Sequence, residues 1–198
     1  TSEEILILDF GSQYTQLIGR RIREAHVYSE ILPFHTSFDE LQRRQPKGII
    51  LSGGPSSVYD RDAPACSPDL YKMGIPILGV CYGMQLIAKD LGGKVEPAQE
   101  REYGYGELQR VGKSSLLNGL KSVWMSHGDR VLEPPPGFEV TARTDTTPAV
   151  IENPERKIFG VQFHPEVVHT ENGSELLRRF VLDICSCSGT WTLGSFLE

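Results

Sequence analysis

Cys81 is placed in this sequence where a cysteine can act as a nucleophile. It follows an apolar run, residues 75–80, that predicts a buried strand, and it precedes residues 82–91, whose apolar positions have helical spacing. This is the geometry of a nucleophile elbow with cysteine in place of serine. Gly79 and Gly83 flank the turn and permit a strained backbone. The free N–H groups at the start of the helix favour a thiolate.

A second apolar run, residues 158–163, ends in His164 and Glu166. A cysteine nucleophile requires a base, and the base requires a group that orients it. The proline between the two residues fixes the local backbone and helps to aim both side chains. The sequence therefore predicts that His164 serves Cys81 as the base and that Glu166 orients His164.

A glycine-rich loop, residues 52–57, follows a predicted strand at 47–51. Loops after parallel strands lie at the carboxyl edge of the sheet, where ligands bind in open α/β folds. We expect the backbone N–H of Gly54 to face Cys81 as half of an oxyanion hole, with the N–H of Tyr82 as the other half. A phosphate-binding loop is disfavoured because Pro55 lacks a backbone N–H. A plain tight turn remains the alternative.

Other interpretations of these residues stay open at the level of sequence. Cys81 could be an inert, buried thiol, since free cysteines are often buried. His127 could compete with His164 as the base. His169 is interpreted as part of a helix start, with Thr170 as a cap. Asp9 is interpreted as a hydrogen-bond acceptor for turn amides rather than as a cation ligand.

Composition excludes several classes of protein. The 198 residues carry a net charge of −6 and contain no basic run, so nucleic-acid binding has no electrostatic support. Apolar stretches fall short of the roughly 20 residues that a membrane-spanning helix requires. The four cysteines form neither a disulfide framework nor a zinc pattern, which predicts free thiols, a reducing cytoplasm and no metal site.

The pattern of apolar residues changes about halfway along the chain. The predicted strands of the first half are residues 4–10, 27–32, 47–51 and 75–80, and the predicted helices are 14–25, 38–44 and 82–91. Short alternating runs between turn signals then predict an antiparallel β excursion over residues 94–163, and a closing helix is predicted at 171–184. The fold class is therefore α/β: a doubly wound, mainly parallel, flavodoxin-like sheet flanked by helices.

The Cys81 elbow, the Ser52–Pro55 loop and the strand end 162–166 together resemble the class I (triad) glutamine amidotransferases. The resemblance extends along the whole chain. It is closest to a subgroup whose glutaminase domain is joined to an ATP-pyrophosphatase domain. The stretches that carry this finer likeness are residues 8–14, 52–59, 101–104, 125–129, 169–173 and 187–191.

The resemblance implies a mechanism for L-glutamine hydrolysis. Cys81 would attack the side-chain amide and form a thioester, and His164 would carry the protons. Gln85, Ser126, Gly128 and Asp129 would help to bind glutamine. No cofactor is expected in the glutaminase domain, because ATP and Mg²⁺ belong to the synthetase part.

The resemblance also implies a domain plan. Residues 1–186 would form the amidotransferase domain, and 187–198 would begin a linker to an ATP-pyrophosphatase domain, in cis or as a separate subunit. No phosphate loop for that domain is found in the 198 residues. The whole enzyme is expected to be a cytoplasmic homodimer. The alternatives are the glutaminase of anthranilate or carbamoyl-phosphate synthesis and a catalytically idle docking domain.

Overall fold

A computed structural model describes residues 3–119, 122–145, 147–170 and 172–194. In these residues nine strands form one sheet in the order β2-β1-β3-β4-β9-β8-β7-β5-β6. The strands are β1 (Glu4–Asp9), β2 (Tyr28–Pro33), β3 (Gly48–Leu51), β4 (Ile77–Val80), β5 (Lys94–Arg110), β6 (Ser122–Glu133), β7 (Glu139–Thr144), β8 (Thr147–Asn153) and β9 (Ile158–Val161).

The first part of the sheet is parallel. Strands β2, β1, β3, β4 and β9 pair in parallel, in the strand order of flavodoxin-like sheets. Four of these strands come from the near-continuous apolar runs that predict strands covered on both faces. The carboxyl ends of β1, β3, β4 and β9 therefore meet at one edge of the sheet.

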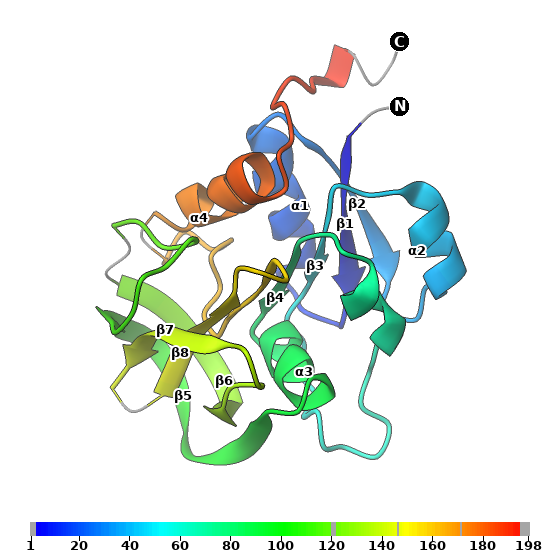
Figure 1. The fold of residues 1–198 in the computed structure, drawn as a ribbon. Coiled ribbons are helices and arrows are strands. Elements are labelled where there is room, and N and C mark those ends of the chain that lie inside the picture. The colour runs from blue at the N-terminus through cyan, green and yellow to red at the C-terminus, as the bar shows by residue number, and fades with distance from the viewer. Residues whose placement is uncertain (1–2, 120–121, 146, 171, 195–198) are drawn as a thin grey trace.

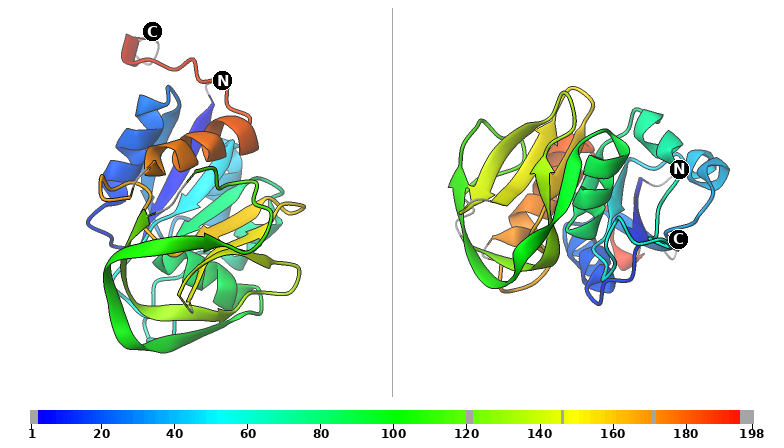
Figure 2. Two further views of the ribbon diagram at one scale, coloured as in Figure 1. Left: turned by 90° about the vertical axis from the view of Figure 1, so that its left-hand side faces the viewer. Right: turned by 90° about the horizontal axis from the view of Figure 1, so that it is seen from below.

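The second part of the sheet is antiparallel, as the alternating runs predict. Strand β8 pairs with both β9 and β7, and β5 pairs with both β7 and β6. Figure 2 shows this part as a curved lobe beside the parallel strands. Strand β5 begins at Lys94, well before the alternating run near Tyr105 that predicts it. Pairing with β6 extends the strand across residues whose own pattern is not that of a strand.

Helices cover both faces of the parallel strands (Figure 1). They are α1 (Thr15–Glu24), α2 (Phe38–Arg44), α3 (Tyr82–Asp90) and α4 (Gly173–Arg179), which continues as the π-helical turn η2 (Phe180–Ile184). Helix α2 begins at the Ser37 cap, whose hydroxyl accepts a hydrogen bond from Glu40 N at 3.2 Å. Glu171, part of the predicted closing helix, lies outside the described residues.

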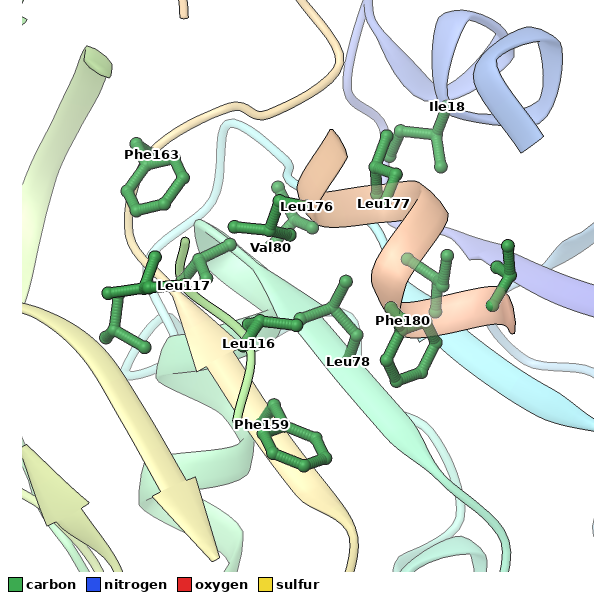
Figure 3. Close-up of a cluster of buried hydrophobic side chains, with 14 of the residues drawn as sticks. Ile18, Leu78, Val80, Leu116, Leu117, Phe159, Phe163, Leu176, Leu177 and Phe180 are labelled. Atoms are coloured by element: carbon green, nitrogen blue, oxygen red, sulfur yellow. The ribbon is translucent and has the colours of Figure 1, made fainter. Parts of the chain in front are cut away.

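Alternate residues of the strands feed two separate cores. Ile5 and Ile7 belong to a cluster with α1 and α4, whereas Leu6 and Leu8 belong to a cluster with α2 and α3. Figure 3 shows the first cluster, in which Leu78, Val80 and Phe159 of the strands lie close to Leu176, Leu177 and Phe180. This two-sided cover is the doubly wound arrangement that the sequence predicts.

The crossover between β3 and β4 differs from the simple strand–helix alternation. It contains only a short 3₁₀ helix, η1 (Pro68–Lys72), and is otherwise irregular. The segment is rich in proline and turn-forming residues, which do not support a longer helix. Among the described residues, no helix is long and apolar enough to cross a membrane.

The tail after η2 packs on the domain. The N–H of Cys187 donates to Val181 O at 3.1 Å, and that of Trp191 donates to His26 O at 2.8 Å. The Trp191 ring lies 5.8 Å from the ring of Tyr28. The linker interpretation of residues 187–198 stays a prediction, and 195–198 lie outside the described residues.

Candidate active site

Cys81 occupies a strained turn between β4 and α3. Its φ is +53° and its ψ is −106°, a backbone conformation that residues other than glycine rarely adopt. The turn is held on both sides: Cys81 N donates to Val161 O at 2.7 Å, and Cys81 O accepts from Gln85 N at 3.1 Å. Close packing also requires the flanking glycines. A Cβ on Gly79 would lie 2.6 Å from the backbone of Gly83.

The sulfur of Cys81 is nearly enclosed by polar groups. The residue is 4% exposed. Its sulfur lies 3.6 Å from the backbone oxygen of Ser126, and Nε2 of Gln162 donates to it at 3.5 Å. The thiol therefore has both an acceptor for its proton and a donor that remains when the proton leaves.

His164 and Glu166 form a buried pair beside Cys81. Nδ1 of His164 lies 2.7 Å from Oε1 of Glu166. Burial lowers the pKa of His164, but hydrogen bonds to Cys81 and Glu166 outweigh it and raise the pKa to about 10. Since Nδ1 faces Glu166, the bond to Cys81 falls to Nε2. The three predicted residues thus form one hydrogen-bonded line, with His164 protonated at neutral pH.

The backbone of His164 is fixed by β6 and by Thr170. His164 N donates to Trp124 O at 3.2 Å. The Thr170 hydroxyl donates to His164 O at 2.7 Å and accepts from Trp124 N at 2.9 Å. Thr170 is therefore not the helix cap that its position suggests, since α4 begins at Gly173 with Asn172 before it. Its hydroxyl connects the backbone of His164 to β6 in the antiparallel part of the sheet.

Glu166 is held by its backbone and is almost fully buried. Arg21 Nε donates to Glu166 O at 3.1 Å. Arginines are mostly exposed in folded proteins, but the side chain of Arg21 is only 18% exposed. Oε2 of Glu166 is buried and has no hydrogen-bond partner among the described residues. The charge of the carboxylate therefore acts mainly on His164.

A pocket of about 560 Å³ opens over Cys81 at the carboxyl edge of the parallel strands. It is lined by Gly11, Ser12, Gln13, Tyr14, Gly54, Pro55, Ser56, Ser57, Asp60, Cys81, Tyr82, Gln85, Tyr103, Ser126, His127, Gly128, Asp129 and His164. Every predicted site residue is in this lining except Glu166, which lies behind His164. The pocket is large enough for an amino acid and presents backbone N–H groups, hydroxyls and carboxylates.

The two predicted oxyanion donors line the pocket beside Cys81. Tyr82 is the first residue of α3, so its N–H has no intrahelical acceptor. Gly54 follows β3, and a Cβ there would collide with the backbone oxygen of Phe10. Glycine is thus required where the loop passes Phe10, beside the pocket that contains Cys81. The role of these N–H groups stays a prediction.

Some of the predicted glutamine-binding groups already have partners within the protein. Nε2 of Gln85 donates to Asp129 O at 3.0 Å and to Gln162 Oε1 at 3.3 Å, which leaves only Oε1 for a ligand. Oδ2 of Asp129 is buried without a partner in the described part of the chain. That orphaned oxygen suits a ligand ammonium group.

His127, the alternative base, also lines the pocket. Its Nδ1 lies 2.6 Å from Asp129 O. His164, in contrast, has a hydrogen bond with Cys81 that raises the pKa of its imidazole. The hydrogen bond with Cys81 therefore favours His164 over His127 as the base.

The sequence interpretation missed several residues of the site. They include Arg21, Thr170 and the sulfur contact of Gln162. Arg21 and Thr170 act through contacts with residues far along the chain, which no local pattern reveals. Gln162 had a signal, because a polar residue interrupts an apolar run just before His164. Asp9, in contrast, behaves as expected: its Oδ1 accepts from Gly11 N at 2.8 Å.

The site offers no cluster of metal ligands. Within the described residues, no group of three or more His, Cys, Asp and Glu side chains is arranged to hold a metal ion. The chemistry that these residues can perform is nucleophilic: a positioned sulfur, a protonated imidazole and N–H donors at a helix start.

Residues 6–184 match the model of the family "Glutamine amidotransferase class-I". The chain therefore belongs to this family.

Its curated relatives narrow the comparison further. It is 54% identical to the protein named GMP synthase [glutamine-hydrolyzing] from Enterococcus faecalis over 200 residues, which cover 99% of this chain and 38% of that protein. It is 57% identical to the protein of the same name from Thermosynechococcus vestitus, over 98% of this chain and 37% of that protein. The chain thus spans well under half the length of these relatives.

Solved structures show the same fold. A protein from Thermoplasma acidophilum, assigned as one of the subunits of a GMP synthase, superposes with a TM-score of 0.79 at 28% identity and covers 94% of this chain and 95% of its own. A glutamine amidotransferase from Thermotoga maritima superposes with a TM-score of 0.72 at 18% identity, covering 93% of this chain and 99% of its own. The second likeness concerns the fold alone.

Proposed function

We propose that this chain is the glutaminase part of a glutamine-hydrolysing GMP synthase. The observation that carries the proposal is the line Cys81–His164–Glu166 at the floor of an amino-acid-sized pocket. The names of relatives that are 52–57% identical over nearly the whole chain supply the acceptor of the ammonia.

The first half of the reaction forms a thioester. The Cys81 thiolate attacks the side-chain carbonyl carbon of glutamine, and the carbonyl oxygen becomes an oxyanion between the N–H groups of Gly54 and Tyr82. The His164 imidazolium donates its Nε2 proton to the amide nitrogen. The C–N bond breaks, ammonia leaves, and a γ-glutamyl thioester remains on Cys81.

The second half releases glutamate. Neutral His164 takes a proton from water as the water oxygen attacks the thioester carbon. The same N–H donors hold the second oxyanion. The C–S bond then breaks, which regenerates the Cys81 thiolate beside protonated His164. Glu166 orients the imidazole throughout and stabilises its positive charge.

The ammonia would pass to ATP-activated xanthosine monophosphate and give GMP. That step belongs to an ATP-pyrophosphatase part, which would bind ATP and Mg²⁺ and which we place in the remaining length of the relatives. We expect the whole enzyme to be a cytoplasmic homodimer. The amidotransferase chemistry of this chain needs no cofactor.

A chimera tests both halves of the proposal. This chain replaces the matching 200 residues of the Enterococcus relative, and GMP formation from xanthosine monophosphate and ATP is measured with glutamine or with ammonium chloride. The parent chimera should use both nitrogen sources. Cys81→Ala should lose only the glutamine-dependent rate, because the thiol forms a bond and is not needed for amination.

Two outcomes would contradict distinct parts of the proposal. A normal glutamine-dependent rate in Cys81→Ala would refute the thioester mechanism. Ammonia release from glutamine without GMP formation, in a chimera that uses ammonium chloride, would refute the assigned acceptor and favour another class I amidotransferase. Mass mapping after treatment with 6-diazo-5-oxo-norleucine should find one adduct, on Cys81.

A further inference from the structure

A buried thiolate needs hydrogen-bond donors from the protein. At 4% exposure, the sulfur of Cys81 has little access to water. A charge that leaves water without compensating hydrogen bonds is costly. The backbone oxygen of Ser126, 3.6 Å from the sulfur, favours the protonated thiol, since it accepts an S–H and repels a negative sulfur. His164 alone would have to offset both effects.

Gln162 supplies a second donor to the sulfur. Its Nε2 lies 3.5 Å from Sγ of Cys81, and the residue is 0% exposed. The residue follows β9 directly, and its backbone N donates to Ala149 O at 2.8 Å. The sheet therefore fixes the backbone of Gln162, and the side chain is held by its contacts with Cys81 and Gln85.

The neighbouring groups determine which end of the Gln162 amide faces the sulfur. Asp129 O is a carbonyl and can only accept, so Gln85 must present its NH₂ group to it. The same NH₂ group meets the Gln162 side chain at 3.3 Å and therefore faces its oxygen. The NH₂ group of Gln162 is then left for Cys81. The orientation follows from a carbonyl that is two side chains away.

We propose that Gln162 stabilises the charged nucleophile by donating a side-chain N–H to the Cys81 sulfur, and that Gln85 is the positioning residue that holds the Gln162 amide in this orientation. The proposal rests on the proposed function for the use of Cys81 as nucleophile. It adds a residue to the site and gives the buried face of Gln85 a role distinct from glutamine binding.

Several other groups influence the charge of this sulfur. The titratable groups that line the pocket with Cys81 are Tyr14 from α1's leading turn, Asp60 from the β3–η1 segment, Tyr82 from α3, Tyr103 from β5, His127 and Asp129 from β6, and His164 after β9. Glu166 acts on the sulfur through His164. None of these side chains is altered by substitutions at Gln162, so a change in thiol reactivity reports the lost amide.

The test measures thiol reactivity and does not depend on glutamine turnover. The rate of Cys81 alkylation by iodoacetamide is followed against pH by peptide mapping, in the parent protein and in Gln162→Met. Methionine keeps the approximate shape but lacks the donor. The midpoint of the pH profile should rise by about one pH unit, which is a tenfold loss of thiolate below the midpoint.

Two further variants separate the donor from its orientation. Gln162→Glu replaces the donor with an acceptor of the same shape, so its midpoint should rise at least as far. In Gln85→Glu, the new carboxylate accepts the Gln162 NH₂ group and turns the Gln162 oxygen towards sulfur, which should also raise the midpoint. Gln109→Met, on an exposed position of β5, is the matched control and should leave the profile unchanged.

A folded Gln162→Met protein, judged by its thermal melt, with an unchanged midpoint would overturn the proposal. Should that variant fail to fold, NMR of the parent protein decides: the Gln162 side-chain amide protons should shift when Cys81 is replaced by Ala. Identical shifts in the two proteins would overturn the hydrogen bond. An intact pH effect without any glutaminase activity would instead fault the proposed function.

Discussion

The imidazole of His164 links Cys81 to Glu166, and both neighbours favour its protonated form. Burial alone would lower the pKa of His164, as for any cation that leaves water. Hydrogen bonds to Cys81 and Glu166 reverse the effect and raise the pKa to about 10. In the proposed mechanism, the imidazole would therefore act first as an acid, towards the leaving ammonia, and as a base only after it has lost that proton.

The effect of Glu166 on the pKa of His164 should be measurable as a change in the free energy of unfolding when Glu166 is replaced by Gln. Glu166 raises the pKa of His164, so it stabilises the fold most where His164 is protonated in the native state. The benefit is fully present below the unfolded pKa of about 6.5 and is lost as pH rises through about 10. The free energy of unfolding of the parent protein should thus exceed that of Glu166→Gln by about 1.5–3 kcal/mol at pH 6.5. At pH 10.5 the difference should be small.

Urea denaturation at the two pH values checks this prediction. Glu175→Gln, on an exposed position of α4, is the control for loss of a carboxylate and should show no such change. A difference between parent and Glu166→Gln that is constant with pH would contradict the coupling. The same variant should lower the glutaminase rate by about 10²-fold or more, because the imidazole loses its orienting charge.

For individual residues, the sequence predicts the site residues that directly follow a strand. It misses the residues that contact the site from other elements. Cys81, His164 and Glu166 each follow an apolar run, so their positions could be inferred from local patterns. Arg21 holds the backbone of Glu166 from a helix distant in sequence, and Thr170 connects His164 to the distant Trp124 of β6. Their side chains look like an exposed arginine and a helix cap until the elements are packed.

Among the elements, helix α3 determines where the nucleophile lies. It starts directly after Cys81 and packs against β3 through Gly83, where a Cβ would collide with the backbone oxygen of Leu51. Close contact of helix and strand brings the free N–H groups of the first turn to the edge of the sheet. The position of the helix N-terminus at this edge therefore depends on the absence of a side chain at Gly83.

Gly83→Ala should accordingly weaken both the fold and the site. The added methyl group meets backbone atoms of Leu51, which cannot move aside as a side chain could. We expect a loss of about 1–3 kcal/mol by urea denaturation, with slower alkylation of Cys81 as the turn shifts. Gly112→Ala is the matched control, because a Cβ there finds its nearest atoms at 3.6 Å. Equal stability of the two variants would contradict the prediction.

The sequence predicts a helix or strand correctly here when the pattern of apolar residues within that element is sufficient to identify it. The near-continuous apolar runs of β1, β3 and β4 and the spacing of α3 identify themselves. Strand β5 does not, because Pro97 and a group of charged residues interrupt its alternation and only pairing with β6 completes it. The crossover after β3 holds a single 3₁₀ helix, because its prolines and turn-forming residues do not support the regular helix that alternation suggests.

In the whole molecule, the carboxyl and amino ends of the parallel strands carry different features. The carboxyl edge carries Cys81, His164 and the pocket. The amino edge carries the tail, where Trp191 packs near Tyr28 and its N–H donates to His26 O, just before β2. A tryptophan such as Trp191 usually needs a packing partner, but the sequence does not tell which surface covers it.

Separation of the edges predicts that the tail stabilises the fold without tuning the site. Trp191→Ala removes a half-buried ring from Tyr28 and keeps the backbone hydrogen bond, so we expect a loss of about 1–3 kcal/mol by urea denaturation. Leu193→Ala, at a residue 66% exposed, should change stability by less than about 0.5 kcal/mol. The pH profile of Cys81 alkylation should be the same in both variants and the parent, because the tail and the sulfur lie at opposite ends of the strands.

Two results would contradict this prediction. A shifted profile in Trp191→Ala would mean that the amino edge is coupled to the site through the sheet. Equal stability of the two variants would mean that the Trp191 ring contributes nothing to the stability of the fold.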